Sequence, residues 1–399
     1  MKKKAQKWVR FRHQVYVWLL RYPVMFVFWL LYGYKHKKIK LSKNENVFII
    51  SNHQTQFDPI LVSLGVNRPV YYVATDTLFS NKFISSLLNH LFDPIPKKKG
   101  LSDPKCIKSM FKIAKEKGSI GLFAEGNRSY AEFQYHIDAG LARLIKTLKM
   151  PLVLFNINGG TGCFPRFAKG FRRGKFYGDV VRRIDAEEYL KMTDEELINT
   201  IKESVKVYDS DNGYEYKSKH RAEYLENMLF VCPKCGKVQT IYSKNEHILC
   251  SNCDLKVEYT TKLHLKSEDK DFTFSKLIDW YEMQKQWCLN SSFEEDEIIF
   301  KDEEVKLFIT QVNKPRKLIS KGKLILTPTR LIFEEKEFEL KDLIIASAIG
   351  GQKFNFSMPD ADYLVIGNKK FNPLKYVLMF NKLETHMKEK QTDKYFTLN

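Results

Sequence analysis

Acidic residues are scarce relative to basic ones in this 399-residue sequence. It has 47 Asp and Glu against 66 Lys and Arg, which gives a formal net charge of +19. This excess indicates an anionic partner, and nucleic acid, an anionic membrane, and phosphorylated or coenzyme substrates all fit it. The hydrophobic content of 44% excludes a disordered chain, and the length allows two or three domains.

Cysteine is also sparse and unevenly placed. Four of the 7 cysteines form two CxxC pairs, and the others are scattered at Cys106, Cys163 and Cys288. The N-terminal apolar stretch lacks the small-residue cleavage site of a secretory signal peptide. Together with the odd number of scattered cysteines, this absence argues against a disulfide framework and favours a reducing, cytosolic setting.

The two CxxC pairs predict a metal site. They are Cys232 with Cys235 and Cys250 with Cys253, separated by the 14 residues from Gly236 to Leu249. Each pair presents two sulfurs from one tight turn, which Gly236 eases, and four thiolates suit tetrahedral Zn²⁺. A zinc site with all four ligands from cysteine has a structural role. The alternative is that these cysteines form disulfides.

The N-terminal segment, residues 1–40, combines basic and apolar residues. Its apolar part, Val15 to Tyr34, has nearly the length needed to span a bilayer, but it contains Arg21 and Pro23. We therefore expect a peripheral or monotopic anchor that lies in the membrane interface and contacts anionic lipid, with a core helix as the alternative. Basic residues flank the apolar part on both sides, at Lys2, Lys3, Lys4, Lys7, Arg10 and Arg12 and at Lys35, Lys37, Lys38 and Lys40.

A first polar block follows a strand-like apolar run. Residues 47–51 predict a short buried strand, and Asp58 with Pro59 predicts a helix start with Asp58 at the N-cap. His53 lies on the loop between them. A continuous helix would place His53 and Asp58 about 140° apart, whereas a loop leading into an N-cap can bring them together.

The spacing of His53 and Asp58 predicts a His–Asp dyad. In such a dyad the carboxylate fixes the imidazole tautomer, and the free ring nitrogen removes a proton from a hydroxyl. The alternative is a helix-start signal without chemistry, since the sequence repeats Asp-Pro at Asp93 and Asp103.

A second polar block follows another apolar strand-like run, which ends at Phe123. The block is Glu125, Gly126, Asn127, Arg128 and Ser129. Gly126 allows a tight turn or a close ligand approach, and the planar guanidinium of Arg128 suits a phosphate. The block predicts a phosphate clamp, and a polar turn with a surface salt bridge is the alternative.

Together the two blocks resemble those of the glycerophospholipid acyltransferase family, whose archetype is 1-acyl-glycerol-3-phosphate acyltransferase. The family's NHxxxxD block is complete as Asn52, His53 and Asp58, and its FPEGTRS block is matched by FAEGNRS at 123–129. Residues 95–99 resemble the family's I-P-V-D-R type block, and residues 150–154 resemble its proline-containing strand. The resemblance covers residues 41 to about 180.

Four departures from the family pattern are visible, and one of them is Phe155, which replaces the usual second proline of the proline-containing strand. Ala124 and Asn127 replace a proline and a threonine, which bears on acceptor preference more than on the reaction. Lys99 stands in the place of an arginine, and an ammonium binds phosphate as a point charge instead of with a bidentate fork.

The resemblance implies an α/β acyltransferase domain with a mixed, largely parallel sheet flanked by helices. It implies that His53 is the general base, that Asp58 orients it, and that Lys99 and the second block bind the acceptor. The donor would be an acyl thioester of coenzyme A or acyl carrier protein, and the acceptor a lysophospholipid such as 1-acyl-glycerol-3-phosphate. The reaction would take place without a covalent enzyme intermediate, at the cytoplasmic face of the membrane.

Local patterns set the expected boundaries of the domains. A helix is expected from Asp103-Pro104 to Lys117, with Ile107, Met110, Phe111 and Ala114 on its buried face. A second helix begins with a capping box at Thr193, and residues 209–213 predict a break. We expect an acyltransferase domain at 41–211, a zinc ribbon at 225–262, a linking helix at 263–292 and a small β-rich domain at 293–399.

The β-rich part alternates short apolar runs with turn signals. Residues 322–333 resemble the pleckstrin-homology-like and GRAM pattern, whose domains often contact membrane lipid or other proteins; a plain β domain is the alternative. The helix before it, at residues 275–289, carries Leu277, Trp280, Tyr281, Gln284 and Cys288 at helical spacing, which is typical of a core-facing helix.

Two other readings compete with the acyltransferase. A zinc ribbon with a net charge of +19 also suits a nucleic-acid-binding protein, but the ribbon offers only Lys237, Lys244 and Tyr242 for stacking and charge. A lipid-binding adaptor with a decayed site is disfavoured by the complete His53 and Asp58 pair. The sequence leaves open the acyl chain length and the oligomeric state.

Overall fold

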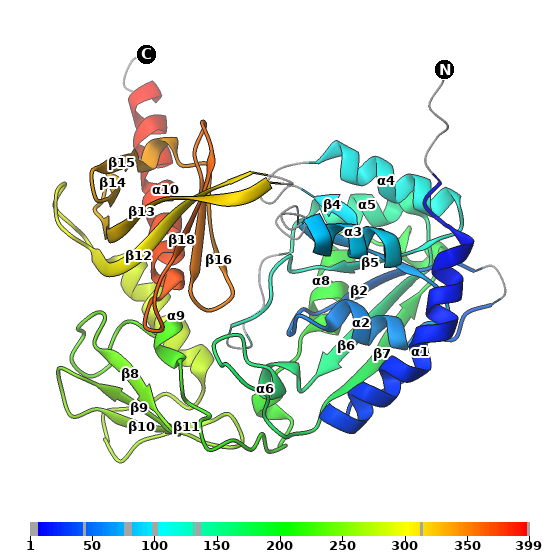
Figure 1. The fold of residues 1–399 in the computed structure, drawn as a ribbon, viewed down its shortest axis with the longest axis horizontal. Helices are drawn as coiled ribbons and strands as arrows, with labels where there is room; N and C mark the ends of the chain where they lie inside the picture. Colours follow the sequence, from blue (N-terminus) through cyan, green and yellow to red (C-terminus); the bar gives the residue numbers. More distant parts are fainter. Residues whose placement is uncertain are drawn as a thin grey trace. The chain divides into compact units, whose positions relative to one another are not determined.

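The computed structural model describes residues 7–42, 45–75, 82–97, 103–130, 132, 137–311 and 314–396. The chain divides into two compact units (Figure 1). Unit 1 comprises Met1–Arg166 and Phe171–Lys217, and unit 2 comprises Phe167–Gly170 and Ser218–Asn399. Each unit is described by itself.

Unit 1 is built on a mixed seven-stranded sheet in the order β1-β7-β6-β2-β5-β3-β4. Strands β2 to β6 are parallel to one another, and β7 runs antiparallel to β6. The predicted α/β class with a largely parallel sheet is therefore confirmed. The strands are β1 (Lys35–His36), β2 (Phe48–Ser51), β3 (Val70–Thr75), β4 (Ile95–Lys97), β5 (Ser119–Phe123), β6 (Leu152–Asn158) and β7 (Tyr177–Ile184).

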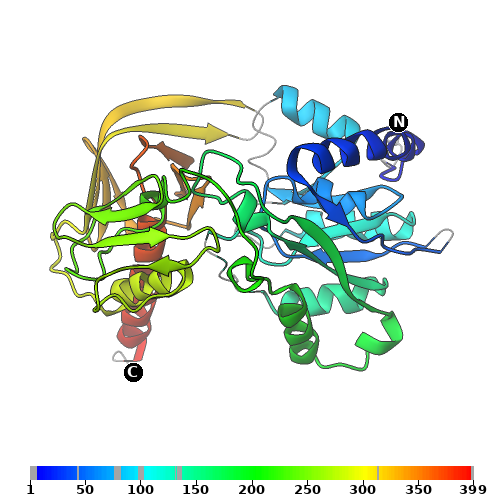
Figure 2. The ribbon, with the colours of Figure 1, turned by 90° about the horizontal axis from the view of Figure 1, so that it is seen from below.

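Helices cover both faces of this sheet. The dark-blue helix α1 and the green helix α8 lie on opposite sides of it in Figure 2. Phe48 and Ile50 of β2 belong to a buried cluster with α4, α5 and α8, while Ile49 points to the other face, which explains the unbroken apolar run of this strand. The helices are α1 (Phe11–Tyr32), α2 (Asp58–Leu64), α3 (Lys82–Leu91), α4 (Pro104–Lys115), α5 (Gly140–Leu148), α6 (Gly160–Cys163), α7 (Ala186–Tyr189) and α8 (Asp194–Val205).

Helix α4 has the predicted start but a different buried face. Asp103 caps it, because its carboxylate accepts hydrogen bonds from two backbone N–H groups of the first turn. Met110 is buried as expected, but Ile107 and Phe111 are exposed, and Cys106 and Ile113 are buried in their place. The helix is rotated so that the small side chain of Cys106 faces the sheet, which the apolar pattern alone did not indicate.

Two other helix signals had different outcomes. The capping box at Thr193 is present, since Glu196 N donates to Thr193 Oγ1 and Thr193 N donates to Glu196 Oε2. The Asp-Pro pair at Asp93 starts no helix: it leads directly into β4. Asp93 has a φ of 44°, outside the helical range, and this turns the chain from α3 into the strand.

Unit 2 begins with a small antiparallel sheet in the order β11-β10-β9-β8. Its strands are β8 (Ile241–Lys244), β9 (His247–Cys250), β10 (Lys256–Tyr259) and β11 (Leu265–Lys266). Helix α9 (Leu277–Asn290) follows, with the predicted residues Leu277, Trp280, Tyr281, Gln284 and Cys288 buried. Trp280 Nε1 donates to Val231 O, and Gln284 Oε1 accepts from Phe230 N and Val231 N, so α9 holds the segment that leads to Cys232.

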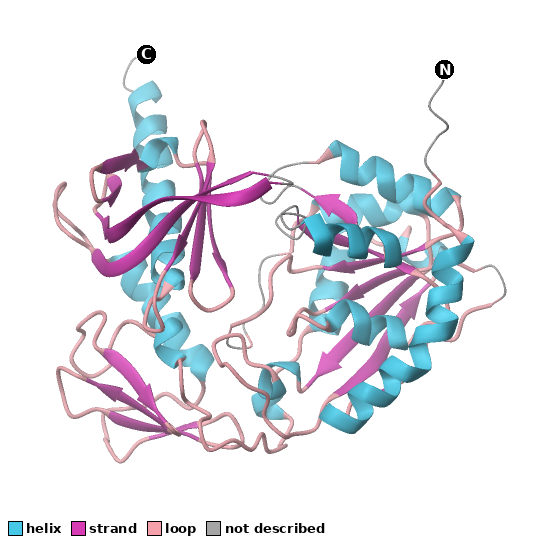
Figure 3. Cartoon of the chain, viewed as in Figure 1, coloured by secondary structure: helices cyan, strands magenta, loops and turns pink. Residues whose placement is uncertain are grey.

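The rest of unit 2 is β-rich, as predicted. Figure 3 shows its strands in magenta and the long helix α10 (Pro373–Phe396) in cyan. The antiparallel sheet has the order β15-β14-β13-β12-β18-β17-β16. In this sheet β12, the first strand along the chain, pairs with β18, the last one. The strands are β12 (Phe300–Gln311), β13 (Lys314–Leu326), β14 (Arg330–Phe333), β15 (Lys336–Glu339), β16 (Ile345–Ile349), β17 (Lys353–Ser357) and β18 (Asp362–Ile366). The pleckstrin-homology-like resemblance of residues 322–333, which lie on β13 and β14, stays a prediction.

The orientation of α4 can be tested with a matched pair of substitutions. Met110 is 3% exposed and Ile107 is 40% exposed. Met110→Ala is expected to lower the free energy of unfolding by about 2–5 kcal/mol, because it leaves a cavity in the core. Ile107→Ala should cost less than about 1 kcal/mol. Urea unfolding of both variants measures the difference, and equal costs would show that the helix faces the core with another side.

Candidate active site

The loop between β2 and α2 folds around the carboxylate of Asp58, which is fully buried. Asp58 Oδ2 accepts hydrogen bonds from the backbone N–H groups of Gln54 at 2.7 Å and Thr55 at 2.9 Å, and Oδ1 accepts from Thr55 Oγ1 at 2.5 Å. These donors replace the water that a buried carboxylate loses, and they hold it in one orientation.

The predicted N-cap position of Asp58 is corrected by the structure. Helix α2 begins at Asp58, and Phe57 is its N-cap. The carboxylate bonds to N–H groups of the preceding loop instead of those of the helix. The reason is that the loop curls back, so its N–H groups lie nearer than those of the first turn. The side chain therefore organises the loop that carries His53.

His53 is held by Asp58 and by an aromatic ring. Its Nδ1 lies 2.8 Å from Asp58 Oδ2. A carboxylate only accepts hydrogen bonds, so Nδ1 carries the proton and Nε2 presents a lone pair. The imidazole stacks on Phe123 at the end of β5, with 4.3 Å between ring centroids and 19° between planes. The side chain is 20% exposed, so a hydroxyl group can reach it.

Asn52 joins the start of this loop to the neighbouring strand. Its Nδ2 donates to Ile157 O and its Oδ1 accepts from Ile157 N, both at 2.8 Å. The last backbone pair of β2 and β6 is Ser51 with Phe155. The Asn52 amide therefore continues the ladder at the point where the backbone leaves the sheet. Asn52 belongs to the first polar block, but the sequence did not predict that its side chain joins the end of β2 to β6.

The second block lies beside His53, as the order of the parallel strands β2 and β5 requires. Gly126 N donates to Phe123 O and closes a turn with Ala124 and Glu125 at its centre. Gly126 has a φ of +63°, and the chain continues to bend through Gly126 and Asn127. Ser129 N then donates to His53 O at 3.0 Å. A cavity of about 20 Å³ lies at this junction, with a lining that includes His53, Glu125 and Ser129.

Arg128 lies close to a second arginine that sequence reasoning missed. Arg166 Nη1 donates to Arg128 O at 2.6 Å, and its guanidinium lies 3.8 Å from the centroid of the Tyr130 ring. Burial, followed by the positive charge of Arg166, lowers the pKa of Arg128. Two guanidinium groups in one partly buried place create a local positive potential. No spacing signal linked Arg166, which follows β6, to the block after β5.

Lys99, the remaining predicted residue of the substrate site, lies outside the described residues. The chain is described up to Lys97, the last residue of β4, and again from Asp103.

A pair of carboxylates that sequence reasoning also missed borders the same cavity: Asp209 is fully buried and Glu132 is partly buried. Glu132 lines the cavity, and its carboxylate accepts from Ser210 N at 2.9 Å and Ser210 Oγ at 2.6 Å. Burial and the charge of Asp209 raise the pKa of Glu132 to about 7. Burial raises the pKa of Asp209 to about 6, although several donors oppose the shift.

Asp209 holds the loop that follows β6. Its Oδ1 accepts from Gly159 N at 2.6 Å and its Oδ2 accepts from Gly162 N at 3.0 Å. Gly160 N, on the same loop, donates to Oε1 of Gln54, the neighbour of His53. The polar run at 209–213 predicted a break, but its first residue is fully buried and supports the site. Composition alone could not show this, because Asp, Ser and Gly are typical of exposed turns.

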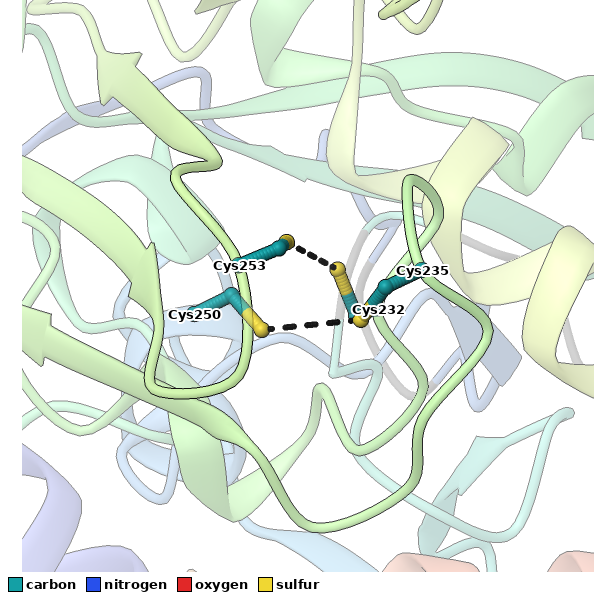
Figure 4. Close-up of side chains that lie close together, drawn as sticks. All are labelled: Cys232, Cys235, Cys250 and Cys253. Carbon is teal, nitrogen blue, oxygen red and sulfur yellow. Dashed lines mark hydrogen bonds between the residues drawn. The ribbon is translucent and has the colours of Figure 1, made fainter.

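The four predicted metal-ligand cysteines come together in unit 2 (Figure 4). Their sulfur atoms all lie within 4.8 Å of one another, with Cys232 and Cys253 at 3.7 Å and Cys235 and Cys250 at 3.8 Å. These separations are too long for disulfides. A zinc ion bound at about 2.3 Å to four sulfurs sets the edges of the tetrahedron at about 3.8 Å. The cluster therefore fits a tetrahedral metal ion.

The carboxylate pair predicts how stability depends on pH. Because the folded pKa of Glu132 lies near 7, above its unfolded value, the folded state binds a proton that the unfolded chain releases. The contribution of Glu132 to the free energy of unfolding should therefore be fully present below about pH 4 and be lost as the pH rises towards 7. Glu132→Gln should reduce this loss by on the order of 1–3 kcal/mol.

Denaturant unfolding at pH 5 and pH 8 measures this effect. Glu195→Gln, a change of the same kind at an exposed position of α8, serves as the control and should keep the wild-type pH dependence. An equal fall in Glu132→Gln and wild type would show that this carboxyl does not titrate as described.

Residues 34–157 match the family model described as Acyltransferase. The match spans less than half of the chain and contains both polar blocks. Among solved structures, the chain is similar to the 1-acyl-sn-glycerophosphate (LPA) acyltransferase PlsC from Thermotoga maritima, with 18% sequence identity and a TM-score of 0.42. That alignment covers 50% of this chain and 81% of that one. No curated protein matches the sequence.

The family match and the geometry concern the same part of the molecule. The matched segment runs from the end of α1 to the end of β6, and it includes His53, Asp58 and the block at 125–129. Residues 34–157 of unit 1 are therefore similar to the acyltransferase family.

Proposed function

We propose that this protein is a membrane-associated acyltransferase that moves a fatty acyl group from an acyl thioester to a hydroxyl of a lysophospholipid. The donor is acyl coenzyme A or acyl carrier protein, the acceptor is 1-acyl-glycerol-3-phosphate, and the product is phosphatidic acid. The observation that carries the proposal is the 2.8 Å contact of His53 Nδ1 with the buried carboxylate of Asp58, inside the segment that matches the acyltransferase family.

The chemistry follows from the free ring nitrogen. His53 Nε2 takes the proton of the acceptor hydroxyl while that oxygen attacks the thioester carbonyl carbon. The tetrahedral species then collapses with cleavage of the carbon–sulfur bond, and the departing thiolate receives the proton from the imidazolium. Asp58 stabilises the imidazolium and holds its orientation. Because the acceptor is itself the nucleophile, no acyl-enzyme forms.

The positive charge near the second block supports a phosphate-bearing acceptor. Arg128 and Arg166 lie next to each other, and Ser129 and Glu125 line the cavity beside His53. A guanidinium offers paired N–H donors that match phosphate oxygens. Lys99 would add a further cation, and we keep it in the proposed acceptor site together with Gly126 and Asn127.

Helix α1 supports attachment to a membrane, for which we propose the cytoplasmic face. It is long and apolar enough to cross a membrane by length and composition. Its Phe28 is buried and its Arg21 Nε donates to Leu64 O, so one side of the helix packs on unit 1. Such packing favours a helix that lies in the interface over one that spans the bilayer. Its outer side exposes apolar residues that include Phe11, Trp18, Leu19, Tyr22, Phe26, Trp29, Leu30 and Leu31.

We further propose that the four cysteines bind a structural zinc ion. Cys232, Cys235, Cys250 and Cys253 would hold it, and their separations fit the tetrahedron described above. With all four positions taken by protein sulfur, the ion would supply no open coordination site for chemistry. It would instead join the turn at Gly236 to the end of β9 and so stabilise the small sheet of unit 2.

Replacement of His53 tests the catalytic proposal. His53→Ala should lower acyl transfer to lysophosphatidate by about 100- to 10,000-fold, because the general base is lost. The exposed His220, which pairs with Glu223 in unit 2, provides the control, and His220→Ala should keep wild-type activity. Both variants are assayed with acyl coenzyme A and with acyl carrier protein donors. Normal turnover by folded His53→Ala would refute the proposed base.

Metal analysis of the purified full-length protein tests the zinc proposal. The wild type should contain about one zinc ion per chain, and Cys232→Ser should lose it because three thiolates bind the ion more weakly. Cys288→Ala, which changes another buried cysteine of unit 2, should keep it. A zinc-free wild type, or zinc retained in Cys232→Ser, would contradict the assignment.

A further inference from the structure

A second cavity in unit 1 has a volume of about 510 Å³. It is formed by the segment that leads into α1, the end of α3, the start of β4 and the outer side of α4. This volume is in the range of small-ligand sites. The residues that matter for its chemistry are Trp8, Arg10, Arg12, His90, Asp93 and Ser109.

This cavity lies at the amino ends of the parallel strands, whereas His53 lies at their carboxyl ends. Asp93 and Pro94 directly precede β4, so they mark the amino end of that strand. His53 follows the carboxyl end of β2. Because β2, β5, β3 and β4 are all parallel, the two sites are separated by about the length of a strand, roughly 16 Å for five residues. A substrate bound at His53 does not fill this cavity.

The wall of the cavity is fixed by buried hydrogen bonds. Glu116 Oε2, at the end of α4, accepts from Trp8 N at 2.9 Å and Val9 N at 2.8 Å. Tyr71 Oη donates to Trp8 O at 3.2 Å and lies 3.0 Å from Nδ1 of the buried His13. These contacts attach the chain before α1 to α4 and β3.

The same hydrogen bonds orient Arg12. Since the hydroxyl hydrogen of Tyr71 points to Trp8 O, His13 Nδ1 carries a proton and His13 Nε2 accepts. Arg12 Nε lies 3.4 Å from that Nε2. Burial, followed by the charge of Arg12, lowers the pKa of His13 to about 4, which keeps the ring neutral. Arg12 is thus held through Nε, and its terminal nitrogens form no hydrogen bond with the residues that the structure describes.

Basic residues outnumber acidic ones around the cavity, where Asp93 is influenced by the charges of both Arg10 and Arg12. Arg10 pairs with Asp93 at 3.2 Å. In the part of the chain that the structure describes, Arg12 forms no such pair. Ser109 lies on α4 between Lys105 and Lys112, four residues before and three after, so both lysines share its helix face. Among the described residues, the cavity therefore combines Arg10 in an ion pair with Asp93, Arg12 outside ion-pair distance of any carboxylate, and a basic rim.

We propose that this cavity binds the phosphate group of an anionic ligand, with the guanidinium of Arg12 as its main donor. A guanidinium presents two parallel N–H groups to phosphate oxygens. The headgroup of an anionic membrane lipid and a soluble phosphorylated compound both carry this group. Phe11, next to the cavity, is 84% exposed and begins the apolar outer side of α1, which would contact the acyl chains of a lipid. The site does not depend on the proposed acyl transfer.

The test uses full-length protein and two probes. Inorganic phosphate binding is measured by calorimetry, and binding to phosphatidylcholine vesicles with and without phosphatidylglycerol is measured by sedimentation. The variants are Arg12→Gln, which removes the donor, and Ser109→Asp, which places a carboxylate at the cavity without touching His13. Lys38→Gln removes an equal charge at an exposed position after β1 and is the control for phosphate binding. Lys191→Gln, at an exposed position between α7 and α8 and away from the basic N-terminal segment, is the control for vesicle binding.

The expected result is that Arg12→Gln and Ser109→Asp weaken phosphate binding by about tenfold, while Lys38→Gln changes it less than twofold. A parallel loss on phosphatidylglycerol vesicles identifies a lipid headgroup as the source. A loss for phosphate alone supports the site with a soluble ligand. Should Arg12→Gln and Ser109→Asp behave like the control variant with each of the two probes, the cavity binds no phosphate and the proposal is wrong. Thermal unfolding of each variant confirms that it is folded.

Discussion

The structure of the candidate active site depends on one buried carboxylate. Asp58 lies where β2 gives way to α2, away from water, and a buried carboxylate is tolerated only when donors surround it. The loop supplies them from Gln54, Thr55 and the ring of His53. The same contacts that satisfy Asp58 therefore fix the position, the plane and the tautomer of the imidazole.

Polar side chains attach the loop that carries His53 to the segments around it. Asn52 fastens its start to β6, and Gln54 fastens its middle to the loop after β6. That loop is held by Asp209, whose neighbour Ser210 bonds to Glu132 on the far side of the cavity. Four segments that are distant in sequence are thus joined through polar side chains. This network holds His53 in place beside the cavity. On the opposite side of that cavity lies Glu132, whose pKa is raised to about 7.

The sequence predicted the parts of the site that are local and left out those that depend on packing. His53 with Asp58 and the block at 125–129 follow strands and could be found from spacing. The sequence could not show that Arg166, Glu132 and Asp209 lie near this site. Their positions depend on how β6, the loop after it and the chain beyond α8 fold back on the sheet. The buried face of α4 was misplaced for a similar reason: Cys106 and Ile107 both suit a core, and only the neighbouring strands decide between them.

The ¹⁵N resonances of the His53 side chain test the central claim most directly. They can be assigned by comparison with His53→Gln. The account predicts that the neutral form of the ring carries its proton on Nδ1 and leaves Nε2 bare. It also predicts that Asp58→Asn, which loses the accepting carboxylate, shifts the neutral ring towards the other tautomer. A ring protonated on Nε2 in the wild type, or one unaffected by Asp58→Asn, would contradict the claim that Asp58 prepares His53 to act as a base.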